Sequence, residues 1–264
     1  MAEITRWVRF EHQGQAGFGT LNGEAVAVHS GDLFGTALPT GQTLALAGLK
    51  LLAPVRPGKV LALWNNYLAL AAKLGLADPA EPLYFMKAPS SLLDPGAAIV
   101  APPGQGKIVF EGELAIVIGR RAKAVSEAQA LQFVFGYTCC NDVTAAEVLN
   151  RDASFAQWVR AKSYDSFCPL GPCIATGLDP VTLRVKTWLD GQLRQDYPVA
   201  DIRFSVPRLV SLISHDMTLE PGDVILCGTS VGVGAMKPGQ TVVVEIEGIG
   251  RLVNQFETAD PRIP

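Results

Sequence analysis

The sequence predicts an α+β fold, built on a curled sheet of mixed and antiparallel strands. Short strand-like segments dominate the chain, helical segments are few, and strands and helices do not alternate regularly. Hydrophobic residues make up 48% of the chain and charged residues 18%, which is typical of a folded protein with a large core. With 264 residues, the chain is long enough for one large domain and a small appendage.

The N-terminal part, residues 1–55, is predicted to be a small β-rich appendage. Up to about residue 52 the chain consists of short alternating segments separated by glycine, and Asn22-Gly23 is a typical tight hairpin turn. A proline-rich connector over residues 53–58 follows. We therefore predict a main domain over residues 56–264.

The first half of the main domain is predicted to contain four strands and three helical segments. The strands are apolar or β-branched segments at 59–63, 83–87, 115–118 and 136–141. Helices are expected at 65–74, which is rich in leucine and alanine, at 126–135, which opens with the capping-box pattern Ser126-Glu127-Ala128-Gln129, and at 142–149.

The second half is predicted to begin with loops, because residues 161–163 and 167–172 are interrupted by serine, proline and glycine. Asp190-Gly191 predicts a hairpin turn between two strands. Ser205, with Pro207 just inside, predicts the start of an amphipathic helix. Strands at 224–227 and 242–246 close the domain.

Two carboxylates stand at the entry to the most apolar predicted strand. Glu111 and Glu113 are two residues apart, so both side chains point to the same face, and Gly112 between them adds no bulk. Like charges side by side are unfavourable unless a positive group lies between them. A hard divalent cation is the natural partner, and Asp142, which ends the next strand, is the third expected ligand. The competing interpretation is a solvated strand edge, and the fully apolar segment at 115–118 counts against it.

Composition and charge argue against several classes of function. The formal charge is −3 and there is no basic segment, so a nucleic-acid partner is not expected. No apolar segment approaches the ~20 residues of a membrane helix, and the first residues lack the pattern of a signal peptide. The odd number of cysteines, without metal-ligand spacing, argues against a disulfide framework. We expect a cytoplasmic protein with no membrane partner, whose buried thiols are reduced: Cys139, Cys140, Cys168, Cys173 and Cys227.

Two segments match the residue pattern of a catalytic or cofactor-binding motif, but the secondary structure that each motif requires is not predicted around them. The segment 228–232 matches G-x-S-x-G, but the residues after it cannot form the helix of a nucleophile elbow, and no histidine follows Ser230. Gly232 and Gly234 lack the strand-turn-helix setting of a dinucleotide fingerprint.

The three histidines are scattered along the chain, which argues against a zinc site: His12, His29 and His215.

Several short segments, in this order, resemble the fumarylacetoacetate hydrolase family over about residues 59–255. The segments are Asn66-Tyr67, Phe85-Met86-Lys87, Glu111-Gly112-Glu113-Leu114, Gly136-Tyr137, Asn141-Asp142-Val143, Ala161-Lys162-Ser163, Asp223-Val224-Ile225, Gly228-Thr229 and Glu247-Gly248-Ile249-Gly250 with Asn254. The order and joint presence of the segments make the resemblance specific. It implies a β-roll-like α+β fold, usually assembled as a homodimer, that acts on a small oxo-acid substrate.

The resemblance also implies a metal centre. Glu111, Glu113 and Asp142 match the family's ligands for Mg²⁺, with Mn²⁺ or Ca²⁺ as alternatives. Three carboxylates leave coordination positions open, and the family uses them to chelate a 2-oxo or 2-enol carboxylate.

Three further residues and a backbone turn receive roles from the same resemblance. Lys162 matches a substrate-facing lysine, a catalytic cation near the oxyanion, for which the alternative is a solvated loop lysine. The resemblance implies substrate binding by the turn at Gly228 and Thr229, and by Lys87 and Gln195 as further pocket residues.

The sequence departs from hydrolytic family members at the positions that activate water. Those members have N-Y-x-x-H-A-x-E, and here Leu70 and Lys73 stand at the histidine and glutamate positions. Ala146 stands where an arginine often follows the metal aspartate, and Ser230 replaces the proline of G-T-P.

These departures favour a reaction that needs no base for water. Hydrolysis of a C–C bond needs such a base, worth about 10²–10⁴-fold in rate, whereas decarboxylation mainly needs an electron sink. We therefore expect decarboxylation or keto–enol isomerisation of a 2-oxo/2-enol dicarboxylate, as in family members of aromatic-compound breakdown. Two alternatives stay open: C–C hydrolysis of an acylpyruvate or fumarylacetoacetate-like substrate, and a decayed member that serves as a binding or assembly subunit.

Overall fold

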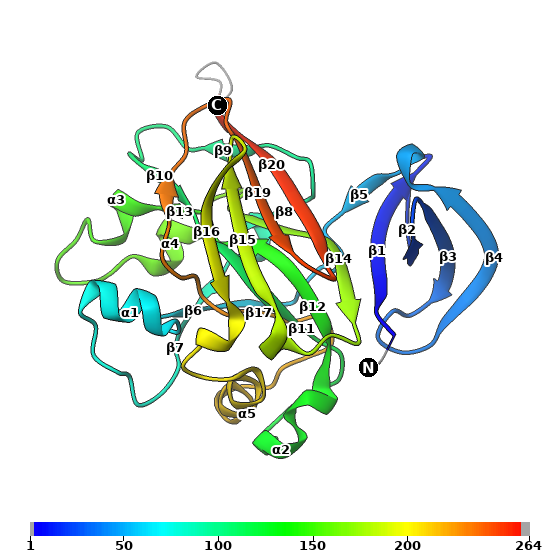
Figure 1. Cartoon of the computed structure of the whole chain (residues 1–264), viewed down its shortest axis with the longest axis horizontal. Helices are drawn as coiled ribbons and strands as arrows, with labels where there is room; N and C mark the ends of the chain where they lie inside the picture. The colour runs from blue at the N-terminus through cyan, green and yellow to red at the C-terminus, as the bar shows by residue number, and fades with distance from the viewer. Residues whose placement is uncertain (1–2, 260–264) are drawn as a thin grey trace.

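A twelve-stranded mixed sheet runs through the molecule in the computed structural model, which describes residues 3–259 (Figure 1). Most neighbouring strands are antiparallel, whereas β17 pairs with β6, and β14 with β8, in parallel. In spatial order the strands are β4 (Ala37–Ala45), β3 (Ala25–Gly31), β2 (Gln15–Asn22), β1 (Thr5–His12), β14 (Cys168–Thr176), β12 (Val134–Asn141), β11 (Gly112–Ile118), β17 (Val224–Leu226), β6 (Val60–Trp64) and β7 (Leu83–Lys87), with β5 (Lys50–Leu52) beside β1 and β8 (Leu92–Leu93) beside β14.

A second sheet packs against the middle of the first. Its strands are β16 (Gln192–Pro198), β15 (Arg184–Leu189), β19 (Thr241–Ile246), β20 (Gly250–Thr258) and β9 (Ile99–Ala101). Strands β15, β19 and β20 lie over β11, β12 and β14, and Leu114, Ile116, Val244 and Leu252 are buried between the two sheets. A three-stranded sheet of β13 (Thr144–Ala145), β10 (Ile108–Phe110) and β18 (Gly234–Ala235) lies at the edge. The mixed, strand-rich α+β architecture that the sequence predicts is confirmed.

Strand β11 is covered on both faces, which explains its continuous apolar sequence. Leu114 and Ile116 pack into one hydrophobic cluster, and Ala115 and Val117 pack into another on the opposite face. A strand covered on both faces has no solvent side that needs polar residues. The solvated-edge interpretation of Glu111 and Glu113 is wrong, because Glu113 is buried and the Glu111 side chain is mostly covered.

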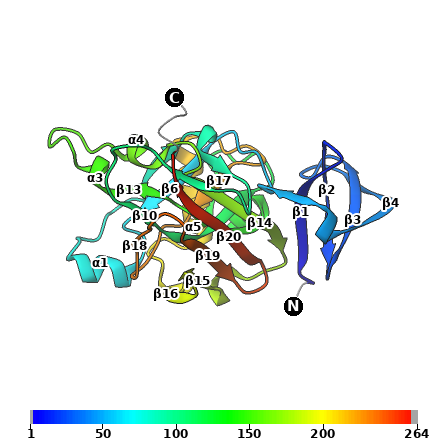
Figure 2. The same ribbon diagram turned by 90° about the horizontal axis from the view of Figure 1, so that it is seen from above.

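The first strands form a β meander that stands to one side of the main body (Figures 1 and 2). Asn22-Gly23 forms the predicted tight turn between β2 and β3, and Gly23 has a positive φ of 59°. The meander also continues the large sheet, because β1 pairs antiparallel with β14 from Thr5↔Thr176 to Trp7↔Ile174.

The helices are short and few. Helix α5 (Val206–Asp216) begins as predicted, with the Ser205 side chain accepting a hydrogen bond from the Arg208 amide. Helix α1 (Leu68–Leu74) starts three residues later than predicted, because Asn65 has a positive φ of 55° and Tyr67 is extended. Helix α2 (Glu127–Ala130) is shorter than predicted and continues only as a 3₁₀ turn, since Ser126 Oγ bonds to the Gln129 side chain and caps no backbone amide. No helix within residues 3–259 has the length and apolar character needed to cross a membrane.

Three local predictions are wrong. The helix expected at 142–149 is divided between β13 and the four-residue α3 (Ala146–Leu149), because Thr144 and Ala145 pair with β10 instead. The loop expected at 161–163 begins as the end of α4 (Trp158–Lys162). Most of the loop expected at 167–172 lies in β14, where Pro169 pairs with Leu93 of β8 and Pro172 falls in the irregular part of the register with β12.

The five cysteines are buried and reduced in the structure, as predicted. Burial raises the pKa of the Cys139, Cys140 and Cys227 thiols well above their usual range, and it raises the pKa of Cys173 to about 12. Cys168 differs, because its hydrogen bond with Cys140 lowers its pKa, although its side chain is inaccessible.

We expect a thiol-specific disulfide reagent at pH 8 to leave the native protein unmodified, because only an accessible thiolate attacks it. Absorbance of the released thiolate measures the reaction. The same protein unfolded in guanidinium should release five equivalents, one per cysteine. Rapid reaction of even one thiol in the native protein would contradict the buried arrangement.

Candidate metal centre

Three carboxylates converge at one end of β11. Glu111 precedes the strand, Glu113 lies within it, and Asp142 directly follows the neighbouring strand β12. The antiparallel register pairs Gly112 with Asn141, and the Asp142 amide donates to the Glu111 carbonyl oxygen at 2.8 Å. One oxygen of each carboxylate therefore lies within 4.8 Å of the others. The structure brings together the three residues that the sequence selected.

The carboxylates are oriented by hydrogen bonds from the surrounding protein. Glu113 Oε2 accepts from the Gly228 amide at 2.8 Å, and Glu111 Oε1 accepts from the Thr144 hydroxyl at 2.9 Å. The Asn141 side chain accepts from the Glu111 amide at 2.9 Å. Thr144 and Asn141 were not selected from the sequence, although both stand within two residues of Asp142.

One oxygen in the cluster is left without a partner. Glu113 Oε1 is buried and has no hydrogen-bond partner within the described part of the chain. A buried carboxylate oxygen without a partner is strongly disfavoured. A cation ligated by this oxygen would satisfy it, and three carboxylates form the oxygen-only ligand set that Mg²⁺, Mn²⁺ and Ca²⁺ prefer. The residues present therefore fit a divalent metal ion.

Two buried lysines lie beside the cluster. Lys162 Nζ, at the end of α4, is 2.9 Å from Glu111 Oε2 and 2.6 Å from Asp142 Oδ2. Lys87 Nζ, at the end of β7, is 2.6 Å from Asp142 Oδ1 and also donates to the Lys162 carbonyl. The interpretation of Lys162 as a solvated loop lysine is wrong, because the residue is only 3% exposed.

The lysines compensate Asp142 and Glu111 but make no ion pair with Glu113 among residues 3–259. Burial raises the pKa of Glu113 well above its usual range, and the charges of Asp142 and Glu111 add to this effect. Burial also raises the pKa of Glu111, which Lys162 partly offsets. Burial acts on Asp142 in the same direction, but the charges of Lys162 and Lys87 outweigh it and lower the pKa. Of the three carboxylates, Glu113 therefore has the negative charge that the surrounding protein compensates least.

The accessible side of the cluster is at Glu111. The Glu111 side chain is 16% exposed, whereas Asp142 and Glu113 are each 1% exposed. A small molecule would therefore approach the carboxylates from the side of Glu111 and Lys162.

Gln195 and Thr229 lie behind the carboxylates and bind Gly112. Gln195 Oε1 accepts from the Gly112 amide at 3.0 Å, and its Nε2 donates to Thr229 Oγ1 at 2.8 Å and to the Ser230 carbonyl at 3.1 Å. Thr229 Oγ1 donates to the Gly112 carbonyl at 3.1 Å. These bonds use the polar atoms of both side chains inside the protein. The arrangement supports a role in positioning the segment between Glu111 and Glu113, which competes with the substrate contacts implied for the two residues.

An aromatic cluster adjoins the lysine. The Trp158 ring lies 5.2 Å from the Phe85 ring in a stacked geometry and 5.2 Å from the Trp64 ring. Lys162 Nζ lies 5.3 Å from the centre of the Phe85 ring. These aromatic residues come from separate elements, so sequence reasoning did not join them. The one available signal is that Trp158 is four residues before Lys162, which is one helical turn.

Three positions at which the sequence departs from hydrolytic family members lie on α1 and α3. Leu70 on α1 packs against the main hydrophobic core, and Lys73 is exposed. Ala146, at the start of α3, is also exposed and carries no charge. The G-x-S-x-G segment enters no helix, as the sequence predicts, since it is followed by a turn and β18.

Comparison with known proteins agrees with this geometry. A family model described as fumarylacetoacetate (FAA) hydrolase C-terminal matches residues 59–257, and one described as Rv2993c-like, N-terminal matches residues 5–54. A 4-hydroxyphenylacetate degradation bifunctional isomerase/decarboxylase from Salmonella dublin is 42% identical over 202 residues, which are 75% of this chain and 47% of that protein.

Two solved structures are similar over nearly the whole chain. The 2-hydroxyhepta-2,4-diene-1,7-dioate isomerase from Mycobacterium marinum has a TM-score of 0.89 and 38% identity, covering 97% of this chain and 99% of the other. The maleylpyruvate hydrolase from Sphingobium sp. SYK-6, in complex with manganese(II) and pyruvate, has a TM-score of 0.80 and 27% identity, covering 97% and 100%. The carboxylate cluster, the fold around it and these matches lead to one assignment: the chain belongs to the fumarylacetoacetate hydrolase C-terminal family.

Proposed function

We propose that this protein is a divalent-metal-dependent enzyme that decarboxylates or isomerises a 2-oxo or 2-enol dicarboxylate. The observation that carries the proposal is the buried, unpartnered Oε1 of Glu113 within a cluster of three carboxylates. Isomerase and decarboxylase relatives support the reaction class, and a hydrolase relative in complex with manganese(II) supports the metal.

Glu111, Glu113 and Asp142 would hold Mg²⁺ or Mn²⁺, which supplies a Lewis acid for the enolate oxygen of the substrate. Three ionised carboxylates and the two ammonium groups of Lys87 and Lys162 sum to −1. With a divalent cation the same groups sum to +1. The loaded site would then attract an anionic oxo acid.

Lys162 acts as a cation and proton donor in this proposal. Burial acts to lower the pKa of Lys162, but the charges of Asp142 and Glu111 outweigh it, so in the metal-free protein the pKa lies above its usual range. In its protonated form the lysine has no free electron pair with which to activate water as a base. It can stabilise a developing oxyanion and can hold the proton that an enolate carbon receives.

Hydrolysis of a C–C bond is the second candidate, favoured by the similarity to a maleylpyruvate hydrolase. Against it, Leu70 and Lys73 stand at the positions of the water-activating pair. The third candidate, a decayed binding subunit, is disfavoured because three clustered carboxylates without function would be unfavourable to bury.

An NMR time course distinguishes the reactions. We expect the protein with Mg²⁺ or Mn²⁺ to accelerate loss of CO₂ or keto–enol exchange of oxaloacetate, and to leave an acylpyruvate intact. Two controls measure the background rate: the metal ion without protein, and the variant Glu113→Gln, in which a proposed metal ligand is replaced. Protein-dependent cleavage of the acylpyruvate would support hydrolysis instead, and no turnover of either compound above background would count against the proposed substrate class.

The substitution Glu113→Gln should weaken Mn²⁺ binding by about 100-fold or more, since changes outside the ligand shell alone reduce metal affinity 10–100-fold. The amide oxygen can keep the bond from the Gly228 amide, which leaves an NH₂ group at the position of Oε1, where it cannot ligate a cation. Isothermal titration calorimetry measures the affinity. The exposed control Glu127→Gln should bind as the wild type does, and unchanged affinity in Glu113→Gln would contradict the assigned ligand set.

The substitution Lys162→Met should separate metal binding from turnover. Removing a positive charge 2.6–2.9 Å from two ligands cannot weaken their attraction for a cation, so Mn²⁺ affinity should stay equal or rise. Turnover should fall by about 10²-fold or more, the usual contribution of a positioned proton donor. Lys73→Met, on exposed α1, is the matched control. Full activity of Lys162→Met would remove the lysine from the mechanism.

A further inference from the structure

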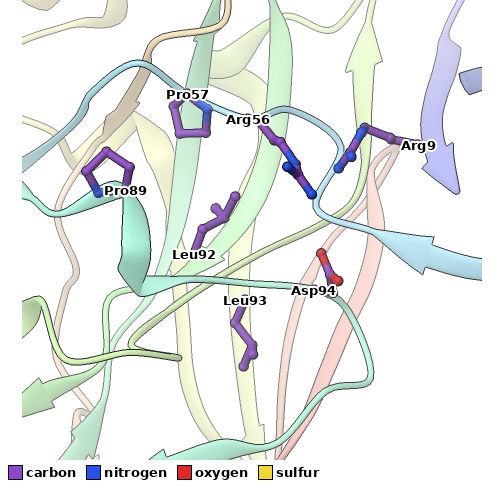
Figure 3. Close-up of a pocket in the computed structure, with 7 residues that line it drawn as sticks. All are labelled: Arg9, Arg56, Pro57, Pro89, Leu92, Leu93 and Asp94. Carbon is purple, nitrogen blue, oxygen red and sulfur yellow. The ribbon is translucent and has the colours of Figure 1, made fainter. Parts of the chain in front are cut away.

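A separate cavity of about 370 Å³ lies between the N-terminal meander and the main domain (Figure 3). Arg9 comes from β1, Arg56 from the connector that follows β5, and Asp94 from the segment after β8. Pro57, Pro89, Leu92 and Leu93 complete the lining. None of these residues belongs to the carboxylate cluster, and within residues 3–259 none of their side chains forms a hydrogen bond or ion pair with it.

The charges in this cavity are not balanced. In Figure 3 the guanidinium groups of Arg9 and Arg56 lie close to each other, with Asp94 below them. Neither arginine has an ion-pair partner among residues 3–259, and Arg9 makes one hydrogen bond, from Nη1 to the Ala53 carbonyl at 3.3 Å. Asp94 Oδ1 accepts from the Ala53 amide at 2.7 Å. Two positive groups and one carboxylate leave a net charge of +1.

The proximity of the two arginines is itself unfavourable. Burial lowers the pKa of Arg9, the neighbouring charge of Arg56 lowers it further, and Asp94 only partly offsets the effect. Like charges are stable side by side when an anion binds to both. Paired guanidinium groups present planar donors that match a carboxylate geometrically.

The remaining wall is apolar. Leu92 and Leu93 are half-buried and lie with Pro57 and Pro89 beside the arginines. Inorganic anions gain nothing from such a wall, whereas an organic acid can bury its hydrocarbon part there. The combination favours one class of ligand, a carboxylate attached to an apolar group.

We propose that this cavity is a second ligand site, in which Arg9 and Arg56 bind the carboxylate of an organic acid and Leu92, Leu93 and Pro57 contact its apolar part. The cavity and the proposed metal centre are formed by different side chains. The two sites are close along the chain, because Lys87 stands two residues before Pro89.

A ligand-observed NMR titration of the metal-free protein with benzoate tests this proposal. Without a divalent ion, the carboxylate cluster repels benzoate, so binding reports on the arginines. Arg56→Gln should weaken benzoate binding about tenfold or more, the size expected when a hydrogen bond to a charged group is lost. Arg56 is exposed, so this variant should fold. Arg120→Gln removes the charge of another exposed arginine outside the cavity and should bind as the wild type does.

Two further probes define the ligand class. Benzyl alcohol, which lacks the charge, and inorganic phosphate, which lacks the apolar group, should each bind at least tenfold more weakly than benzoate. Equal benzoate affinity in Arg56→Gln, or equal affinity of the wild type for either probe, would overturn the proposal. A change of oligomeric state in Arg56→Glu, measured by light scattering, would show that the arginines bind a second copy of the chain and would overturn it as well.

Discussion

The burial of three carboxylates at one end of β11 is the constraint on which the rest of the structure depends. Like charges held within 4.8 Å repel strongly in a medium of low polarity, so the fold must supply positive groups around them. Lys87 and Lys162 compensate Glu111 and Asp142, and the Gly228 amide donates to Glu113. Among residues 3–259, Glu113 Oε1 is left without a partner, and this oxygen is where the proposed cation would bind.

The arrangement of sheets explains how the cluster can be held rigidly. The backbone of Gly112 is bound by the Gln195 side chain and by the hydroxyl groups of Thr229 and Tyr197, which come from the second sheet and from the turn after β17. Glycine is required at this position, because an added Cβ would stand 2.0 Å from Thr187 Oγ1. The two sheets therefore meet beside Glu111 and Glu113, so the fold holds these side chains as firmly as a precise metal site would require.

Much of this site follows from local rules of sequence. The two-residue spacing of Glu111 and Glu113 is a consequence of strand geometry, and Asp142 was predicted as a third carboxylate at the end of the next strand. The antiparallel register, which was not predicted from the sequence, places the end of β12 beside the start of β11. The helix at Ser205 and the turn at Asn22-Gly23 were also predicted, since their signals are contained in a few neighbouring residues.

Other features depend on tertiary contacts and could not be predicted. Helix α4 has five residues, too few to show a periodic pattern, so the buried position of Lys162 depends on its contacts with Asp142 and Glu111. Strand β14 contains prolines that indicate a loop locally, but its place between β1 and β12 outweighs them. The aromatic group around Trp158 joins three separate elements, and no local signal connects them.

The central claim, that Glu111, Glu113 and Asp142 bind one divalent ion, is tested most directly by a crystal structure of the protein with Mn²⁺, using anomalous scattering to locate the metal. The account predicts a single strong peak at coordination distance from one oxygen of each carboxylate, with Glu113 Oε1 among the ligands. A peak elsewhere, or a fully occupied ion that leaves Glu113 Oε1 without a partner, would contradict it.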